Sequence, residues 1–114
     1  MTLEAKNARI EGTTLGIEDH GCLIFYLHLD YGGGGQGFGG FVLDTHVERG
    51  QPRIGTVFGT TAILRVLQVL GVGTWEKLPG TPVRVEADGS KIYRIGHYLK
   101  DEWLDLEELA KELE

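Results

Sequence analysis

The sequence has little of what a secreted or membrane protein requires. It contains a single cysteine, Cys22, so an internal disulfide is excluded. The longest apolar runs, residues 23–27 and 66–72, are interrupted early and are too short to cross a bilayer. No basic segment followed by a long apolar run opens the chain, so no signal peptide is expected. We therefore expect a protein of the reducing cytoplasm that has no membrane partner.

Neither disorder nor several domains fits the composition. Apolar residues make up 41% of the 114 residues and charged residues 25%, which is ordinary for a globular protein. This length suits one domain, residues 1–114, with one hydrophobic core. Such a domain buries enough surface to fold without a disulfide or a metal ion.

The chain lacks an excess of basic residues. Its formal net charge is −6, and the last fourteen residues hold seven acids against one base, so the rest of the chain is neutral. Polyphosphate grooves need a positive field, and broad nucleic-acid binding is therefore not expected. A small anionic ligand held by two or three arginines remains compatible with this charge.

The hydrophobic pattern predicts an α+β fold. Apolar residues alternate from Leu23 to Leu29, which is typical of a strand with one buried face. Ile63, Val66 and Leu70 recur at helical spacing. We expect strands at residues 6–11, 22–31, 38–44, 81–87 and 91–99, a polar turn at 13–21, a helix from Thr60 or Thr61 to Leu70, and an acidic helix at 104–113. Strands and helices in runs indicate an antiparallel sheet of about five strands with one central helix and one short acidic C-terminal helix.

Glycine is abundant, and five of the six residues at positions 32–37 are glycine. Residues 35–40 fit G-x-G-x-x-G, but a strand is expected after them, whereas a dinucleotide-binding fold has a helix there. Glycine costs backbone entropy, which a fold tolerates where positive φ is required or where another group approaches the backbone. The segment is either a flexible hairpin tip or a ligand-contacting loop. The candidate ligand-binding residues around it are His28, Asp30, Gln36, Gly37, Phe38, Gly39 and Asp44.

Arginine supplies a second candidate site. Arg84 and Arg94 lie on strands that face each other across the turn expected at residues 88–89. Together with Arg65 they would form an anion site, because guanidinium groups bind phosphate bidentately. The alternative is a charged outer face balanced by Glu86. Trp103 is expected to be buried, with base stacking as the alternative.

No catalytic or metal-binding pattern stands out. Asp19, His20, His28, Asp30, Asp44 and His46 include residue types that bind zinc, but no pair has a recognised ligand spacing. Cys22 opens an apolar strand, and Ser90 lies in a turn, so neither needs a catalytic explanation. We predict a protein that is not an enzyme and has no cofactor or bound metal. A small metal-dependent enzyme using His28 and Asp30 is the least favoured alternative.

Several sequence blocks together carry a resemblance. They are residues 17–21 (IEDHG), 28–31 (HLDY), 35–40 (GQGFGG), 43–44 (LD), 75–80 (WEKLPG), 83–85 (VRV), 95–97 (IGH) and 100–103 (KDEW). Through them the chain resembles a family of small accessory proteins of tailed phages, and the blocks cover most of its length. The resemblance implies a viral accessory protein acting in the host cytoplasm, and it transfers no catalytic residue.

Two functional hypotheses follow from this resemblance, since small phage accessory proteins often counter host defence. The leading one is a non-catalytic homo-oligomer that sequesters a nucleotide-derived immune signal, with arginines for phosphate and glycine backbone close to the ligand. The alternative is a direct inhibitor of a host defence nuclease or effector, similar to anti-CRISPR proteins, whose acidic C-terminal helix occupies a nucleic-acid groove.

Overall fold

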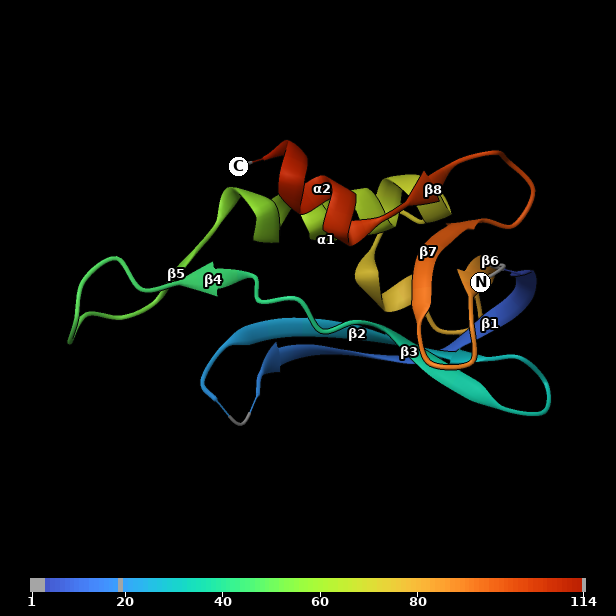
Figure 1. The fold of residues 1–114 in the computed structure, drawn as a ribbon, viewed down its shortest axis with the longest axis horizontal. Helices are drawn as coiled ribbons and strands as arrows, with labels where there is room; N and C mark the ends of the chain where they lie inside the picture. The colour runs from blue at the N-terminus through green and yellow to red at the C-terminus, as the bar shows by residue number, and fades with distance from the viewer. Residues whose placement is uncertain (1–3, 19, 114) are drawn as a thin grey trace.

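The computed structural model describes residues 4–18 and 20–113. It confirms the α+β class: a six-stranded antiparallel sheet carries two helices, and a separate two-stranded ribbon extends from one end (Figure 1). Within the described residues, no helix is both long enough and apolar enough to span a membrane.

The elements follow the chain in the order β-β-β-β-β-α-β-β-β-α, with a short 3₁₀ helix, η1, after the first α-helix. Their bounds are β1 Glu4–Ile17, β2 Leu23–Asp30, β3 Gly35–Gly39, β4 Asp44–Thr45, β5 Ile54–Gly55, α1 Val57–Leu70, η1 Trp75–Lys77, β6 Pro82–Ala87, β7 Ile92–His97, β8 Trp103–Leu104 and α2 Leu106–Glu112.

The long strand β1 organises the sheet, whose order is β3-β2-β1-β6-β7-β8. Its first half pairs with β6 and its second half with β2, with a shift of register between Ile10 and Gly12. β3 comes close to β7, so the sheet curves into a partly open barrel. This connectivity, with α1 between the third and fourth barrel strands, resembles that of OB-fold barrels. The likeness concerns architecture, and a fold does not by itself specify a function.

The core fills the space between the curved sheet and the helices. Phe25, Leu27 and Leu29 project inward from β2, as the alternation predicts. Val66 and Leu70 of α1 are buried against them together with Leu106 and Leu109 of α2. Figure 1 shows both helices on the same side of β1, β2 and β3, which leaves the opposite face of these three strands uncovered.

The predicted turn at residues 13–21 is wrong over its first part, because residues 13–17 pair with β2. The predicted returning strand at residues 38–44 is also misplaced. It begins at Gly35 and ends at Gly39, since the reversal needs only residues 31–34, closed by a 2.8 Å hydrogen bond from the Tyr31 N–H to the Gly34 carbonyl. Residues 35–39 of the glycine-rich segment are therefore strand, and only residues 31–34 form the turn.

The starts of the two helices differ from the prediction: α1 begins earlier and α2 begins later than expected. α1 starts earlier than Thr60, because the side chain of Thr56 accepts a hydrogen bond from the Gly59 N–H and caps the helix. It ends at Leu70, as predicted, and Gly71 follows in the left-handed conformation that caps the helix. α2 starts later, because Trp103 and Leu104 form the edge strand β8 and the Asp105 side chain caps the helix.

Candidate functional site

The glycine segment on β3 packs closely against β2. A Cβ atom at Gly35 or Gly39 would overlap the backbone carbonyl of Leu29 or Phe25, respectively. Gly39 also has φ +125°, a conformation that side-chain-bearing residues rarely adopt. Phe38, predicted as a ligand contact, is instead a core residue that is 3% exposed. Strand packing therefore explains most of this segment without a ligand.

The uncovered face of β2 and β3 carries two of the predicted residues, His28 and Gly37. His28 is exposed, shares a 3.1 Å hydrogen bond with the Thr14 hydroxyl, and stacks on Tyr26 with ring centroids 6.3 Å apart. Gly37 lies directly across from His28 on β3. The Tyr26 ring lies over this glycine, and an added Cβ there would be 3.4 Å from the ring. The result is a flat aromatic surface beside bare backbone.

Asp30, Gln36 and Asp44 already have partners within the chain. The Asp30 carboxylate accepts a 2.8 Å hydrogen bond from the Gly32 N–H, and the Gln36 side chain accepts one from the Tyr31 hydroxyl. Asp44 forms a bidentate pair with Arg53, with both bonds at 2.8 Å. This guanidinium lowers the pKa of the Asp44 carboxyl. The three side chains do not meet at one point with His28, since Asp44 lies beyond β3 on the ribbon.

The arginines of β6 and β7, Arg84 and Arg94, also have hydrogen-bond partners within the chain. Arg94 forms a bidentate pair with Glu86, at 2.6 and 2.7 Å, which confirms the balanced outer face and lowers the pKa of this glutamate. Arg84 donates to the carbonyls of His97 and Lys100 at 2.9 and 2.7 Å. Neither guanidinium is therefore free to grip a phosphate bidentately without losing these contacts.

Trp103 of β8 lies next to Arg84 and Arg94, and the sequence indicated this position only weakly. Its ring covers Gly96 of β7, where a Cβ atom would lie 2.7 Å from the ring carbons. The guanidinium groups of Arg84 and Arg94 lie 4.9 and 4.6 Å from its centroid. The ring is thus a surface on which guanidinium groups already stack.

A cavity of about 460 Å³ opens beside this tryptophan, between α1, β8 and α2. We call it the acidic groove. Its charged and aromatic lining consists of Arg65, Arg94, Glu102, Trp103, Asp105, Glu108 and Glu112. Of the three predicted arginines, two therefore meet at one cavity, while Arg84 reaches only the neighbouring tryptophan.

Comparison with known proteins gives no match: no family model fits the sequence, and neither a curated protein nor a solved structure is significantly similar to it. The functional argument consequently rests on the geometry and charge of the chain itself.

Carboxylates dominate the acidic groove. Among the described residues, Glu102, Glu108 and Glu112 form no ion pair and no side-chain hydrogen bond. Arg94 is neutralised by Glu86, so Arg65, whose guanidinium donates to the Gln68 side chain at 3.1 Å, is the remaining positive charge. The groove also borders the last turn of α1 through Gln68 and Val69, where the helix dipole is negative and which contains no basic residue. This field favours a cation and opposes a phosphate.

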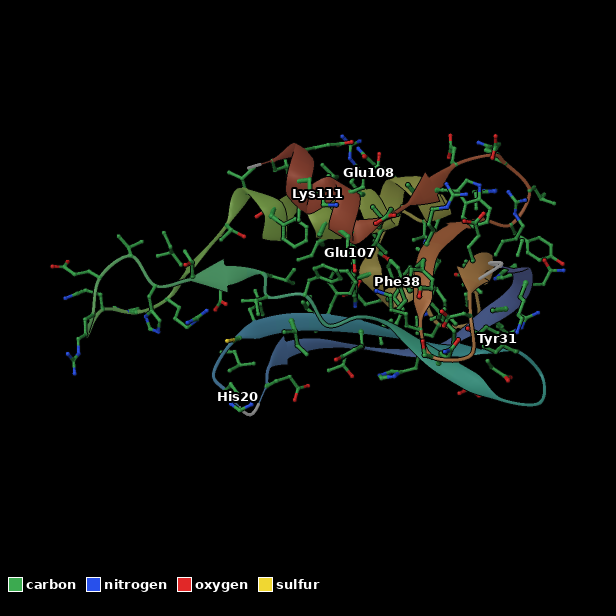
Figure 2. All side chains as sticks on the ribbon, in the orientation of Figure 1. His20, Tyr31, Phe38, Glu107, Glu108 and Lys111 are labelled. Atoms are coloured by element: carbon green, nitrogen blue, oxygen red, sulfur yellow. The ribbon has the colours of Figure 1, made fainter. Side chains whose placement is uncertain are left out.

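A second cavity of about 240 Å³ lies where β3 approaches β7, and we call it the β3–β7 pocket. It brings Gly37, Phe38 and Gly39 together with Lys91 and Tyr93. Lys91 is held at 2.9 Å by Glu107, the residue immediately before the groove-lining Glu108. Figure 2 shows Glu107 on the side of α2 that faces Phe38 and the sheet, and Glu108 on the other side. The two cavities therefore flank α2.

The predicted metal-ligand residues are spread over the molecule. Within residues 4–18 and 20–113, no three His, Cys, Asp or Glu side chains gather closely enough to hold a metal ion. Asp19 lies outside the described residues. His20 lies on the turn after β1, at the opposite end of the sheet from Tyr31 (Figure 2). His28 and Asp30 share a face of β2, but each already has the hydrogen-bond partner given above.

Proposed function

We propose that this protein is a non-catalytic binding protein whose acidic groove takes a basic segment of a partner protein. The observation that carries the proposal is a groove wall of four carboxylates, three of them without partners among the described residues, opposed by Arg65 alone. Desolvated or clustered carboxylates attract lysine and arginine side chains and steer their approach.

Trp103 supports arginine in particular as the bound side chain. Its ring already stacks with two guanidinium groups of the same chain, which shows that this wall of the groove accommodates guanidinium beside carboxylates. The volume of the groove, about 460 Å³, lies within the range of pockets that enclose small ligands. It suits a few side chains from a segment better than a whole folded surface.

The resemblance to phage accessory proteins suggests the kind of partner. Host defence nucleases and effectors carry basic segments where they hold nucleic acid, and an acidic groove competes for such segments. The proposal thus develops the direct-inhibitor hypothesis. Within the acidic segment, we expect Glu102, Glu108 and Glu112 to act. Glu107 is not expected to take part, because it is paired with Lys91.

The test uses fluorescence anisotropy with a labelled octa-arginine peptide as the probe and a labelled octa-glutamate peptide as its counterpart. The purified protein is expected to bind octa-arginine and not octa-glutamate. Replacing Glu102, Glu108 and Glu112 with lysine is expected to weaken binding by at least about a hundredfold, because three attractive charges become repulsive.

The matched control reverses three exposed acids outside the groove, Glu11, Glu48 and Glu76. It changes the net charge of the protein equally, so its binding should fall far less than that of the groove variant. Equal losses in the two variants would mean that net charge alone attracts the peptide, and the groove would then have no role.

A nucleotide-derived ligand is the second candidate, on the strength of a separate observation. The stacked pair of Tyr26 and His28 lies next to Gly37, which also lines the β3–β7 pocket with Lys91. Aromatic surfaces beside bare backbone suit base stacking. Calorimetry against cyclic dinucleotides, cyclic trinucleotides and cyclic ADP-ribose isomers tests it, with His28→Ala and Lys91→Gln expected to weaken any binding. Absence of heat at high ligand concentration would remove this candidate.

A further inference from the structure

The ribbon formed by β4 and β5 carries an unusual amount of exposed apolar surface. We call residues 42–57 the arm. Val42, Val47, Ile54 and Val57 are 47%, 69%, 51% and 72% exposed, respectively. Figure 1 shows the arm extending beyond the end of the main sheet. Apolar side chains gathered on a projection mark an interaction surface more often than a solvated loop.

The arm is held in a fixed direction at its base. Besides the bidentate pair of Arg53 with Asp44, the Leu43 N–H donates to the Leu23 carbonyl of β2 at 2.8 Å. The Thr56 N–H donates back to the Leu43 carbonyl at 3.1 Å. Because these contacts preset its direction, an arm of this kind binds with little loss of conformational entropy.

The ribbon itself is short. Only two residue pairs join its strands, Asp44 with Gly55 and Thr45 with Ile54. A two-stranded ribbon is at best marginally stable in water and gains from further strands or from packing. The exposed valines and isoleucine would supply that packing if another surface covered them.

The surface next to the arm is apolar as well. Ile17, at the end of β1, is 76% exposed, and Leu15 is 44% exposed. Ile17 pairs with Leu23, whose carbonyl receives the hydrogen bond from the arm at Leu43. Figure 1 accordingly shows the end of β1 and the arm at the same end of the molecule. One end of the folded molecule therefore offers both an apolar projection and an apolar patch.

We propose that this end is the interface of a homodimer, in which the arm of each copy covers the end of β1 in the other. A two-fold axis requires that contact i–j be repeated as j–i, and a chain that carries both the projection and the patch meets this requirement. Charge points the same way. Asp44 and Glu48 balance Arg49 and Arg53, so the arm selects neither a basic nor an acidic partner. The excess acid of the chain lies in residues 101–114, outside this interface.

The experiment measures mass by light scattering and sedimentation over a range of concentrations. The unchanged protein is expected to be a dimer. Replacing Val47 and Ile54 with aspartate is expected to raise the dimer dissociation constant by at least about a hundredfold, since the interface would then bury unpaired carboxylates. The control replaces Leu64 and Leu99, exposed apolar residues outside the arm, with aspartate and should remain dimeric. Circular dichroism checks that each variant folds.

A cysteine cross-link tests the geometry without adding charge. In a Cys22→Ser background, Ile17→Cys combined with Val47→Cys should form disulfide-linked dimers on oxidation, whereas Leu99→Cys should not. A monomeric unchanged protein, a dimer that survives the arm substitutions, or equal cross-linking by both cysteine variants would overturn the proposal. None of these outcomes bears on peptide binding by the acidic groove, which is measured separately.

Discussion

Gly39 and Gly37 lie two residues apart on β3, and the structure predicts opposite outcomes when each is replaced by alanine. Gly39 has φ +125°, and an added Cβ would overlap the Phe25 carbonyl. Gly37 has no positive φ, and an added Cβ would touch the Tyr26 ring at 3.4 Å. Comparing the two substitutions therefore distinguishes a glycine that the backbone conformation requires from one that alanine can replace.

The expected magnitude for Gly39→Ala has two parts. Holding a non-glycine residue at this φ costs about 1–3 kcal/mol. Moving β3 away from the Phe25 carbonyl costs about 1–3 kcal/mol more, as overpacking does in well-packed cores. The free energy of unfolding should therefore fall by roughly 2–6 kcal/mol, out of about 5–15 kcal/mol for a domain. Gly37→Ala should stay within about 0.5 kcal/mol of the parent protein.

Urea denaturation followed by circular dichroism measures both variants under the same conditions. With a slope of about 1–3 kcal/mol per molar urea, the midpoint of Gly39→Ala should drop by at least about 0.7 M, several times the shift of Gly37→Ala at the same slope. The fluorescence of the folded Gly37→Ala protein should match the parent. If both variants were equally stable, close packing against β2 would not be the reason for glycine at position 39.

Two further predictions follow from the contacts around β7. The Tyr93 hydroxyl and then the Ser90 hydroxyl and backbone N–H hold the pKa of Asp88 far below its usual range, so its stabilising effect is present above the unfolded pKa near 3.8 and is lost as pH falls further. Thermal unfolding from neutral to acid pH should consequently show a weaker loss of stability below about pH 4 in Asp88→Asn than in the parent. Gly96→Ala should displace the Trp103 ring, shift its fluorescence to longer wavelength and cost about 1–3 kcal/mol in urea denaturation; an unchanged emission spectrum would contradict the contact.

Alternation of apolar residues predicted the central strands well, because each strand buries one face. Leu23 to Leu29 and residues 82–87 fall where this pattern places them. The glycines of β1 broke the pattern: Gly12 lies opposite the exposed His28, and an added Cβ at Gly12 or Gly16 would meet open space, so neither position requires a buried side chain. A face without a layer over it gives no periodic signal, and the strand was therefore predicted too short.

The start of α1 was missed for a different physical reason. Gly59 suggests a break in a helix, yet it lies inside the first turn of α1 and is buried. A Cβ there would overlap the Leu43 backbone, so the glycine allows the start of the arm to lie against the helix. Such a contact joins residues sixteen apart in the sequence, and local propensity carries no information about it.

The candidate site was predicted only in part. The balance of Arg94 by Glu86 could be inferred from the hairpin, because the two residues flank one turn and share one face. The bidentate pair of Asp44 with Arg53 could not, since the intervening residues show no strand pattern. Trp103 was expected to be buried, and its role in the wall of the acidic groove depends on β8, an edge strand of only two residues that the sequence did not predict.

Ion pairing within the chain changes which functional class the residues support. A phosphate site needs guanidinium groups without competing partners, and Arg53 and Arg94 are committed to carboxylates while Arg84 binds carbonyl groups. Each internal ion pair neutralises an arginine, whereas the unpaired carboxylates beside α2 keep their negative charge. The excess negative charge of the chain, −6 in total, is therefore concentrated near a tryptophan that already stacks with guanidinium groups. For this reason the structure favours a cationic partner at the acidic groove over an anionic ligand held by the arginines.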